Sequence, residues 1–159
     1  MANSVYEVLV TESALQKPNE NGNVTAGAVV DFSGVVRKLE GDGREIEGIE
    51  YECHIKMAEH QMRMIADAAK EKFQLKQVVL HHRIGFVKAG EASLFLRVAT
   101  AHRAAAFQAS EWIVDELKKK VPIWKKLRLR QGSGGEAVAD VPGTGDTGSR
   151  DRRSRLQRT

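Results

Sequence analysis

The chain has 159 residues, of which 42% are hydrophobic and 29% charged, with a formal net charge of +4. This length suits one domain with its own hydrophobic core, and no stretch approaches the roughly 20 apolar residues of a membrane span. The start, MANSVYEVLVTESALQ, has neither a basic beginning nor a continuous apolar run, so no secretory signal is predicted. A single cysteine, Cys53, excludes an internal disulfide and a Cys-rich zinc site, which favours a reducing cytoplasm.

The positive charge is concentrated at the end of the chain. The last ten residues, RDRRSRLQRT, hold five arginines and one aspartate, a net +4 that equals the excess of the whole chain. Such a tail can bind polyanions without sequence preference. The first 149 residues are balanced in charge, so the folded part carries no basic footprint, and a nucleic-acid partner is disfavoured.

Composition divides the chain near Gln131. Residues 131–159 contain no aromatic residue and are rich in Gly, Ser, Thr and Asp. Such a segment buries too little apolar surface to offset the entropy of ordering, so it is predicted to be disordered or loosely docked. The predicted domain is therefore residues 1–130.

Residues 5–10 and 24–36 have strand composition, and a loop with the turn sequence Gly-Asp-Gly follows at 37–45. The next apolar residues alternate with glutamates, which predicts a half-buried strand: Ile49, Tyr51, Cys53 and Ile55. A helix over 57–73 follows, with one apolar stripe made of Ala58, Met62, Ile65, Ala69 and Phe73.

Two further strands are predicted at 77–84 and 93–100. The last helix is expected over 103–120, with Ala106, Ala109, Ile113 and Leu117 facing the core. Pro122 ends it, since proline lacks the amide donor and disfavours helix in the preceding residue. The pattern predicts an α+β fold with a mainly antiparallel sheet and two principal helices, similar to an α/β hammerhead.

Common catalytic templates are missing from the sequence: it has no G-x-S-x-G, no Walker loop, no Rossmann glycine fingerprint and no H-E-x-x-H. The histidines lack a metal-ligand spacing, and His81 and His82 should point to opposite faces of a strand. Cys53 lies in an alternating apolar series, so core packing is favoured over thiolate catalysis.

Cationic residues remain as candidates for chemistry. Arg37 leaves a buried-looking strand, His102 and Arg103 lie at a strand-to-helix junction, and Lys118 and Lys125 flank the break at Pro122. The free N–H groups of a helix start favour anions, although solvation of helix ends is the alternative for each residue. Arg103 and Lys118 would lie about 22 Å apart on one helix, so a shared small-molecule site requires two subunits.

Several motifs occur in order: His82-Arg83-Ile84-Gly85, Gly90-Glu91, AHRAAAF at 101–107, and DELKKKVPIWKK at 115–126. With GAVVDFSGVVR at 27–37, they resemble the catalytic (large) subunit family of molybdopterin synthase over about residues 24–126. The resemblance implies a sulfur transferase of molybdenum-cofactor synthesis, which converts cyclic pyranopterin monophosphate to molybdopterin by forming a dithiolene. It also implies a homodimer at the centre of a heterotetramer. A small ubiquitin-like subunit would donate sulfur from its C-terminal Gly-Gly thiocarboxylate.

By resemblance, Lys118 is the principal active-site lysine and Lys125 the second, while Lys119, Lys120 and Lys126 solvate the rim. Residues 121–124 would form a buried turn that brings Lys125 beside Lys118. Substrate would be held by Arg37, by Phe32 lining the pocket, and by His102 with Arg103 from the partner subunit. No metal or organic cofactor is implied for this subunit.

The sequence departs from the family pattern after Lys126. Leu127 stands where members commonly have glutamate, and the tail lacks the tryptophan of a later family element, so no tail arginine is assigned a role. The alternative to an enzyme is a non-catalytic paralogue that binds a ubiquitin-like carrier tail or an anionic nucleotide-like ligand.

Overall fold

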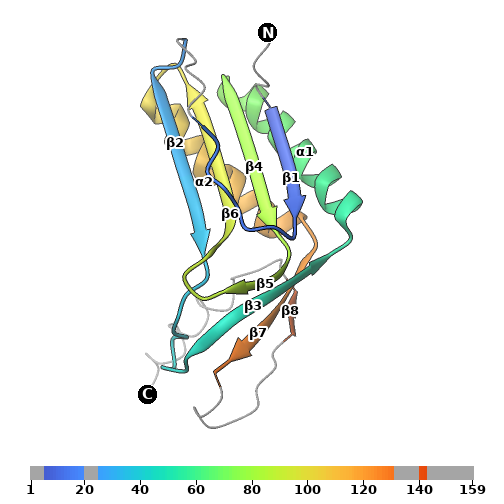
Figure 1. Cartoon of the computed structure of the whole chain (residues 1–159). Coiled ribbons are helices and arrows are strands. Elements are labelled where there is room, and N and C mark those ends of the chain that lie inside the picture. Colours follow the sequence, from blue (N-terminus) through green and yellow to red (C-terminus); the bar gives the residue numbers. More distant parts are fainter. Residues whose placement is uncertain (1–5, 20–24, 131–139, 143–159) are drawn as a thin grey trace, which may run out of the picture.

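The computed structural model describes residues 6–19, 25–130 and 140–142. Two four-stranded sheets lie one above the other in Figure 1, and two helices accompany the upper one. The strands are β1 (Tyr6–Thr11), β2 (Ala28–Val35), β3 (Ile46–Cys53), β4 (Gln77–Arg83), β5 (Gly85–Lys88), β6 (Ala92–Thr100), β7 (Ile123–Leu129) and β8 (Asp140–Pro142); the helices are α1 (Ile55–Phe73) and α2 (Arg103–Lys120).

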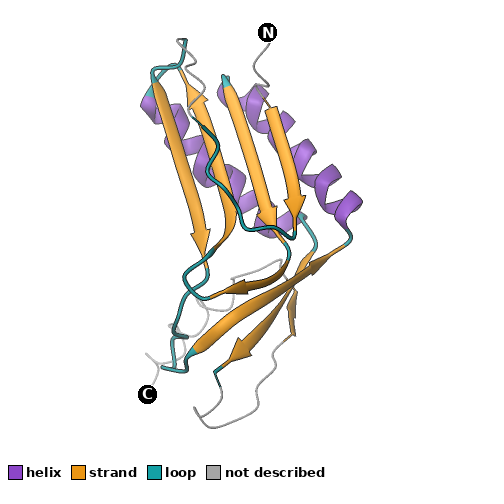
Figure 2. Ribbon diagram, viewed as in Figure 1, coloured by secondary structure: helices purple, strands orange, loops and turns teal. Residues whose placement is uncertain are grey.

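The first sheet has the strand order β1-β4-β6-β2. Its β1 and β4 are parallel, while β4 with β6 and β2 with β6 are antiparallel. Both helices pack on one face of this sheet (Figure 2), α1 against β1 and β4 and α2 against β6 and β2. The main core lies between these layers and includes Val78, Leu80, Leu96 and Val98, each with no exposed surface.

The second sheet has the strand order β5-β3-β7-β8, and its pairs are antiparallel. Gly48 on β3 lies beneath the ring of Phe86 on β5, and a Cβ there would collide with that ring and with the Val87 carbonyl oxygen. Buried Val87, Ile46 and Ile123 join this sheet to the main core.

Each helix is positioned by one apolar stripe, since residues three and four apart share a face. The buried residues of α1 are Ala58, Met62, Ile65, Ala66 and Ala69, and those of α2 include Ala106, Ala109, Ile113 and Leu117. The Nδ1 atom of His54 accepts from the Met57 amide and caps the start of α1. Helix α2 ends before Pro122, as predicted.

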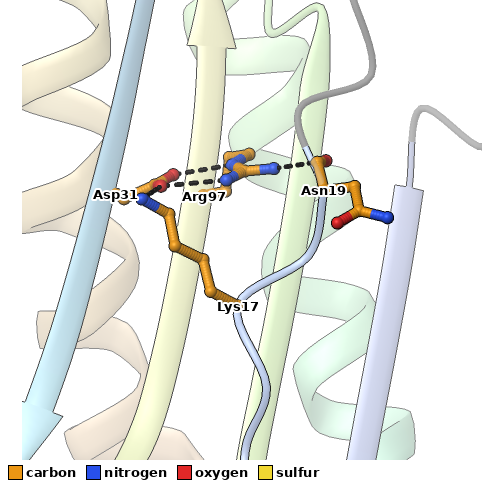
Figure 3. Close-up of polar contacts among 4 residues, drawn as sticks. All are labelled: Lys17, Asn19, Asp31 and Arg97. Carbon is orange, nitrogen blue, oxygen red and sulfur yellow. Dashed lines mark hydrogen bonds and ion pairs between the residues drawn. The ribbon is translucent and has the colours of Figure 1, made fainter.

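Residues 12–19 cross the face of the first sheet that the helices leave open (Figures 1 and 3). On that face Arg97 of β6, whose side chain is 3% exposed, forms an ion pair with Asp31 of β2. Its Nη1 also donates to the Asn19 backbone oxygen at 3.0 Å, and Lys17 reaches Asp31 at 3.2 Å. A charged cluster therefore ties the crossing segment to the sheet.

The predicted α+β class, the two helices and the mainly antiparallel strand pairing are confirmed, but the strands form two sheets where one was predicted. Four details were wrong. Ile55 begins α1 and is 44% exposed instead of ending a strand. Residues 85–88 form strand β5 and residues 123–129 form strand β7, and neither strand was predicted. Trp124 is 55% exposed instead of lying in a buried turn. Of the predicted tail, residues 140–142 form β8, and the rest lies outside the described residues. Neither of the described helices is apolar enough over its length to cross a membrane.

Candidate functional site

Lys118 lies in the last turn of α2, where three consecutive lysines follow Leu117. Cations are favourable at this end of a helix because the unpaired carbonyl groups carry partial negative charge. Lys118 is exposed, whereas Lys120 forms an i,i+4 ion pair with Glu116 at 2.7 Å. That pairing supports a rim role for Lys120 and leaves Lys118 as the candidate for chemistry.

Lys125 is the third residue of β7 and shares a strand face with Ile123 and Leu127. Ile123 is buried and Leu127 packs on the core, so Lys125 is a half-buried cation on the inward face. Trp124 lies on the opposite face and is exposed, so the predicted buried turn over 121–124 is wrong for that residue. The chain begins strand β7 at Ile123. Whether Lys125 meets Lys118 stays a prediction.

Lys126 faces away from Lys125 and pairs in register with Glu50 of β3. Glu50 accepts from Arg128 at 2.5 Å, and that hydrogen bond, with a smaller effect from Lys126, keeps the pKa of its carboxyl below the ordinary value. The outer face of β7 therefore carries paired surface charges. This arrangement supports the prediction that Lys126 belongs to the rim.

Tyr51 and His82 lie beside Lys125 at the junction of the two sheets. Tyr51 is the register partner of Lys125, and its ring meets the His82 ring edge-on with centroids 5.4 Å apart. Burial lowers the pKa of His82 to about 4, with a further lowering from the charge of Lys125. Burial raises the pKa of Tyr51. Both aromatic groups are therefore uncharged at neutral pH.

Phe32 and Arg37 belong to β2 and to the loop that follows it. Phe32 lies on the helix-facing side of β2 and is 38% exposed, while Arg37 is exposed two residues beyond the strand. In Figure 1, β2 and α2 both end on the side of the first sheet that faces the second sheet. Arg37 follows β2 at that end, Lys118 lies in the last turn of α2, and Lys125 lies in the second sheet, whereas Phe32 is the fifth of the eight residues of β2.

His102 and Arg103 lie at the opposite end of α2 (Figure 1). His102 is the N-cap residue but its side chain makes no capping hydrogen bond, so free N–H groups remain at this helix start. The Thr100 hydroxyl donates to the His102 carbonyl oxygen at 2.6 Å, and the Gly27 amide donates to the Thr100 carbonyl oxygen at 3.0 Å. These hydrogen bonds connect the strand-to-helix junction before α2 to the end of β6 and to Gly27, the residue before β2.

Within one chain, helix α2 separates His102 and Arg103 at its start from Lys118 at its end. An 18-residue helix spans about 27 Å, far more than a small pterin phosphate. A site that uses both groups would therefore combine one end of α2 with the other end of α2 in a second copy. Each such site would hold several cations and suit an anionic substrate.

The remaining sequence candidates behave as packing residues. Cys53 is half-buried against the core, and burial raises the pKa of its thiol, which disfavours a thiolate nucleophile. His81 and His82 point to opposite faces of β4, as predicted: His81 faces Glu7 at 3.3 Å, and His82 faces Tyr51. Within the described ranges, no group of three or more His, Cys, Asp or Glu side chains could hold a metal ion.

Comparison with known proteins identifies the family. The family model described as MoaE protein matches residues 6–120. The chain belongs to the MoaE family. A molybdopterin synthase catalytic subunit from Thermoplasma volcanium is 41% identical over 109 residues, covering 69% of this chain and 79% of the relative. The human protein of that name is 40% identical over 107 residues, covering 67% of this chain and 56% of the relative.

A solved MoaE-type structure supports the same assignment. Molybdopterin synthase from Staphylococcus aureus superposes with a TM-score of 0.66 at 30% identity, covering 85% of this chain and 98% of the other. The MoaE match includes Phe32, Arg37, His102, Arg103 and Lys118 but ends before Lys125.

Sequence reasoning missed the residues that support the candidate site within this MoaE chain. Tyr51 was predicted only as a strand residue, and His82 only as a strand and motif residue. Their contact with each other depends on how the two sheets meet. Gly27 was named only as the first residue of the motif at 27–37. The available signals were Arg83 next to His82 and the alternation of apolar and polar residues around Tyr51. Neither signal shows which residues of different strands become neighbours.

Proposed function

We propose that this protein is the catalytic subunit of molybdopterin synthase. It transfers sulfur in molybdenum-cofactor biosynthesis, converting cyclic pyranopterin monophosphate to molybdopterin. The observation that carries the proposal is the MoaE match over residues 6–120, which includes both ends of α2. Sulfur comes from the C-terminal thiocarboxylate of a small ubiquitin-like carrier subunit.

Lys118 and Lys125 are proposed to act on the thiocarboxylate of the carrier. As the sulfur leaves the acyl carbon, negative charge develops on the acyl oxygen, and an ammonium group nearby stabilises it. A lysine can also assist proton transfer to the departing group. The exposed Lys118 suits contact with an inserted carrier tail, and the half-buried Lys125 suits a pocket wall.

Arg37, together with His102 and Arg103 from a second copy, is proposed to hold the phosphate and the pterin. A guanidinium donates two hydrogen bonds to phosphate at once, and the free N–H groups at the start of α2 add to the attraction for an anion. Phe32, which is 38% exposed on β2, provides an apolar surface for the pterin ring.

The assembly proposed here is a homodimer at the centre of a heterotetramer with two carrier subunits, located in the cytoplasm. A single free cysteine agrees with a reducing compartment. The non-catalytic alternative is not favoured, because the relatives from Thermoplasma volcanium and human both bear the name of a catalytic subunit. No metal or organic cofactor is proposed for this subunit.

Reconstitution tests the function directly. The protein is mixed with thiocarboxylated carrier and cyclic pyranopterin monophosphate, and molybdopterin is measured. We expect turnover by the wild type and a loss of at least about a hundredfold in Lys118→Ala, since removing one oxyanion-stabilising donor typically costs that much. Lys119→Ala, one residue away and also exposed, is the matched control and should remain active. Carrier binding without product in the wild type would instead indicate the non-catalytic paralogue.

A further inference from the structure

The junction of the two sheets contains a buried imidazole beside a proposed active-site lysine. His82 is the last buried residue of β4, with 9% of its surface exposed. Its ring contacts Tyr51 of β3. Tyr51 in turn pairs in register with Lys125 of β7. Three strands from two sheets thus bring together a histidine, a tyrosine and a lysine that are far apart in the sequence.

The tautomer of His82 follows from its hydrogen bond. Its Nδ1 lies 2.8 Å from the backbone carbonyl oxygen of Arg83. A carbonyl oxygen can only accept, so Nδ1 carries the proton and Nε2 of the neutral ring is left as an acceptor. Of the charged side chains in the described part of the chain, Lys125 is the one whose charge acts on the pKa of His82.

Tyr51 fixes the position of the histidine. It is 5% exposed and meets His82 at an interplanar angle of 74°, and the neighbouring Ser93 of β6 opposes the rise in the pKa of Tyr51 that burial causes. Ser93 in turn donates to the Gly34 carbonyl oxygen of β2 at 3.4 Å. This chain of contacts anchors the second sheet to the first at the level of Lys125.

We propose that His82 is a positioning residue for Lys125: together with Tyr51 it forms a neutral polar wall that orients the lysine side chain without neutralising its charge. This inference rests on the proposed role of Lys125 in sulfur transfer. A carboxylate in the place of His82 would pair with the ammonium and weaken its attraction for a developing oxyanion. An apolar residue would remove one of the two polar groups of this wall.

The proximity of His82 to Lys125 can be tested without an activity assay. In the full-length protein, ¹⁵N NMR of the imidazole should show a neutral, Nδ1-protonated ring at pH 7. On acidification, the pKa of His82 should lie higher in Lys125→Met than in the wild type, because a nearby positive charge has been removed. Lys126→Met, on the opposite face of β7, is the matched control and should leave this pKa unchanged. Equal pKa values in Lys125→Met and Lys126→Met would overturn the proposal.

The effect on catalysis is tested with two substitutions of His82 and a control at His81. His82→Phe should lower kcat about tenfold while carrier binding is unchanged, and His82→Asn, which keeps a polar group, should recover part of the loss. His81→Gln, on the same strand but the opposite face, should retain wild-type kcat. Wild-type kcat in His82→Phe, with Lys125→Met inactive, would overturn the positioning role and leave the proposed function standing. Full activity of Lys125→Met would instead refute the catalytic role of that lysine.

Discussion

Arg97 and Asp31 form a two-pronged ion pair across β6 and β2: Nε lies 2.7 Å from Oδ1, and Nη2 lies 2.9 Å from Oδ2. The two residues are direct register partners. A planar guanidinium matches a carboxylate in this geometry, and the pair is stronger than one made through a single contact. Nη1 of Arg97 donates to the backbone oxygen of Asn19, so Arg97 also holds residues 12–19, which cross the sheet (Figure 3).

Removing the carboxylate should destabilise the protein. Asp31→Asn leaves the buried Arg97 without its counter-charge, and we expect the free energy of unfolding in urea to fall by about 2 to 3 kcal/mol. The double variant Asp31→Leu with Arg97→Met should be more stable than Asp31→Leu alone, since no unpaired buried charge remains. Glu45→Gln is the control: its partner Arg130 is 67% exposed, so a change within about 0.5 kcal/mol is expected. Equal losses in Asp31→Asn and Glu45→Gln would contradict this account.

Stability should also depend on pH through His82. Its pKa is about 4 in the folded protein and 6.5 as the ordinary value, so between these pH values the unfolded chain binds more protons. Unfolding free energy therefore rises with pH across this window, and acidification from 6.5 to 4 should cost about 3 kcal/mol. Urea unfolding at several pH values measures the slope. In His82→Phe the slope should become shallower over the same window, and an unchanged slope would assign it to other groups.

Gly27 should affect substrate binding through the helix start. A Cβ at this position would meet the Ala101 carbonyl oxygen, directly before His102. We expect Gly27→Ala to displace the junction and raise KM for cyclic pyranopterin monophosphate about tenfold, with a smaller change in kcat. Gly41→Ala is the matched control, because a Cβ there has no neighbour within 4 Å. A kcat loss without a change in KM would show that the junction does not serve substrate binding.

A site shared between subunits predicts complementation. Arg103→Ala and Lys118→Ala should each lose activity, but mixed dimers formed by subunit exchange contain one intact site. About a quarter of wild-type activity is then expected from random mixing. Mixing Lys118→Ala with Lys125→Ala provides the control, because both lysines are proposed to come from one chain and no intact site can form. Recovery in neither mixture would contradict a site that combines the two ends of α2.

Local signals account for what could be predicted, and long-range packing accounts for most of the rest. Helix α2 was predicted with its observed bounds, because its apolar stripe and Pro122 are features of neighbouring residues. Strand β5 was missed because its four residues are too few to show alternation. Ile55 was assigned to the preceding strand, since a histidine at position 54 is an uncommon N-cap residue. The candidate site was proposed from motif resemblance, whereas the Tyr51–His82 contact required knowledge of how two sheets meet.

The short strand β8 leads to a prediction about the end of the chain. Val141 is the register partner of Lys125, so residues 140–142 cover the edge of β7 at the proposed second lysine. Deleting residues 143–159 should leave turnover unchanged, because this keeps β8. Deleting 131–159 should raise hydrogen exchange at the amides of β7 and lower turnover several-fold, since an edge strand without its neighbour exchanges more readily. The test is to measure both variants with the same carrier and substrate. If the two deletions have the same activity and the same exchange in β7, β8 does not support the position of Lys125, and the site is complete within residues 1–130.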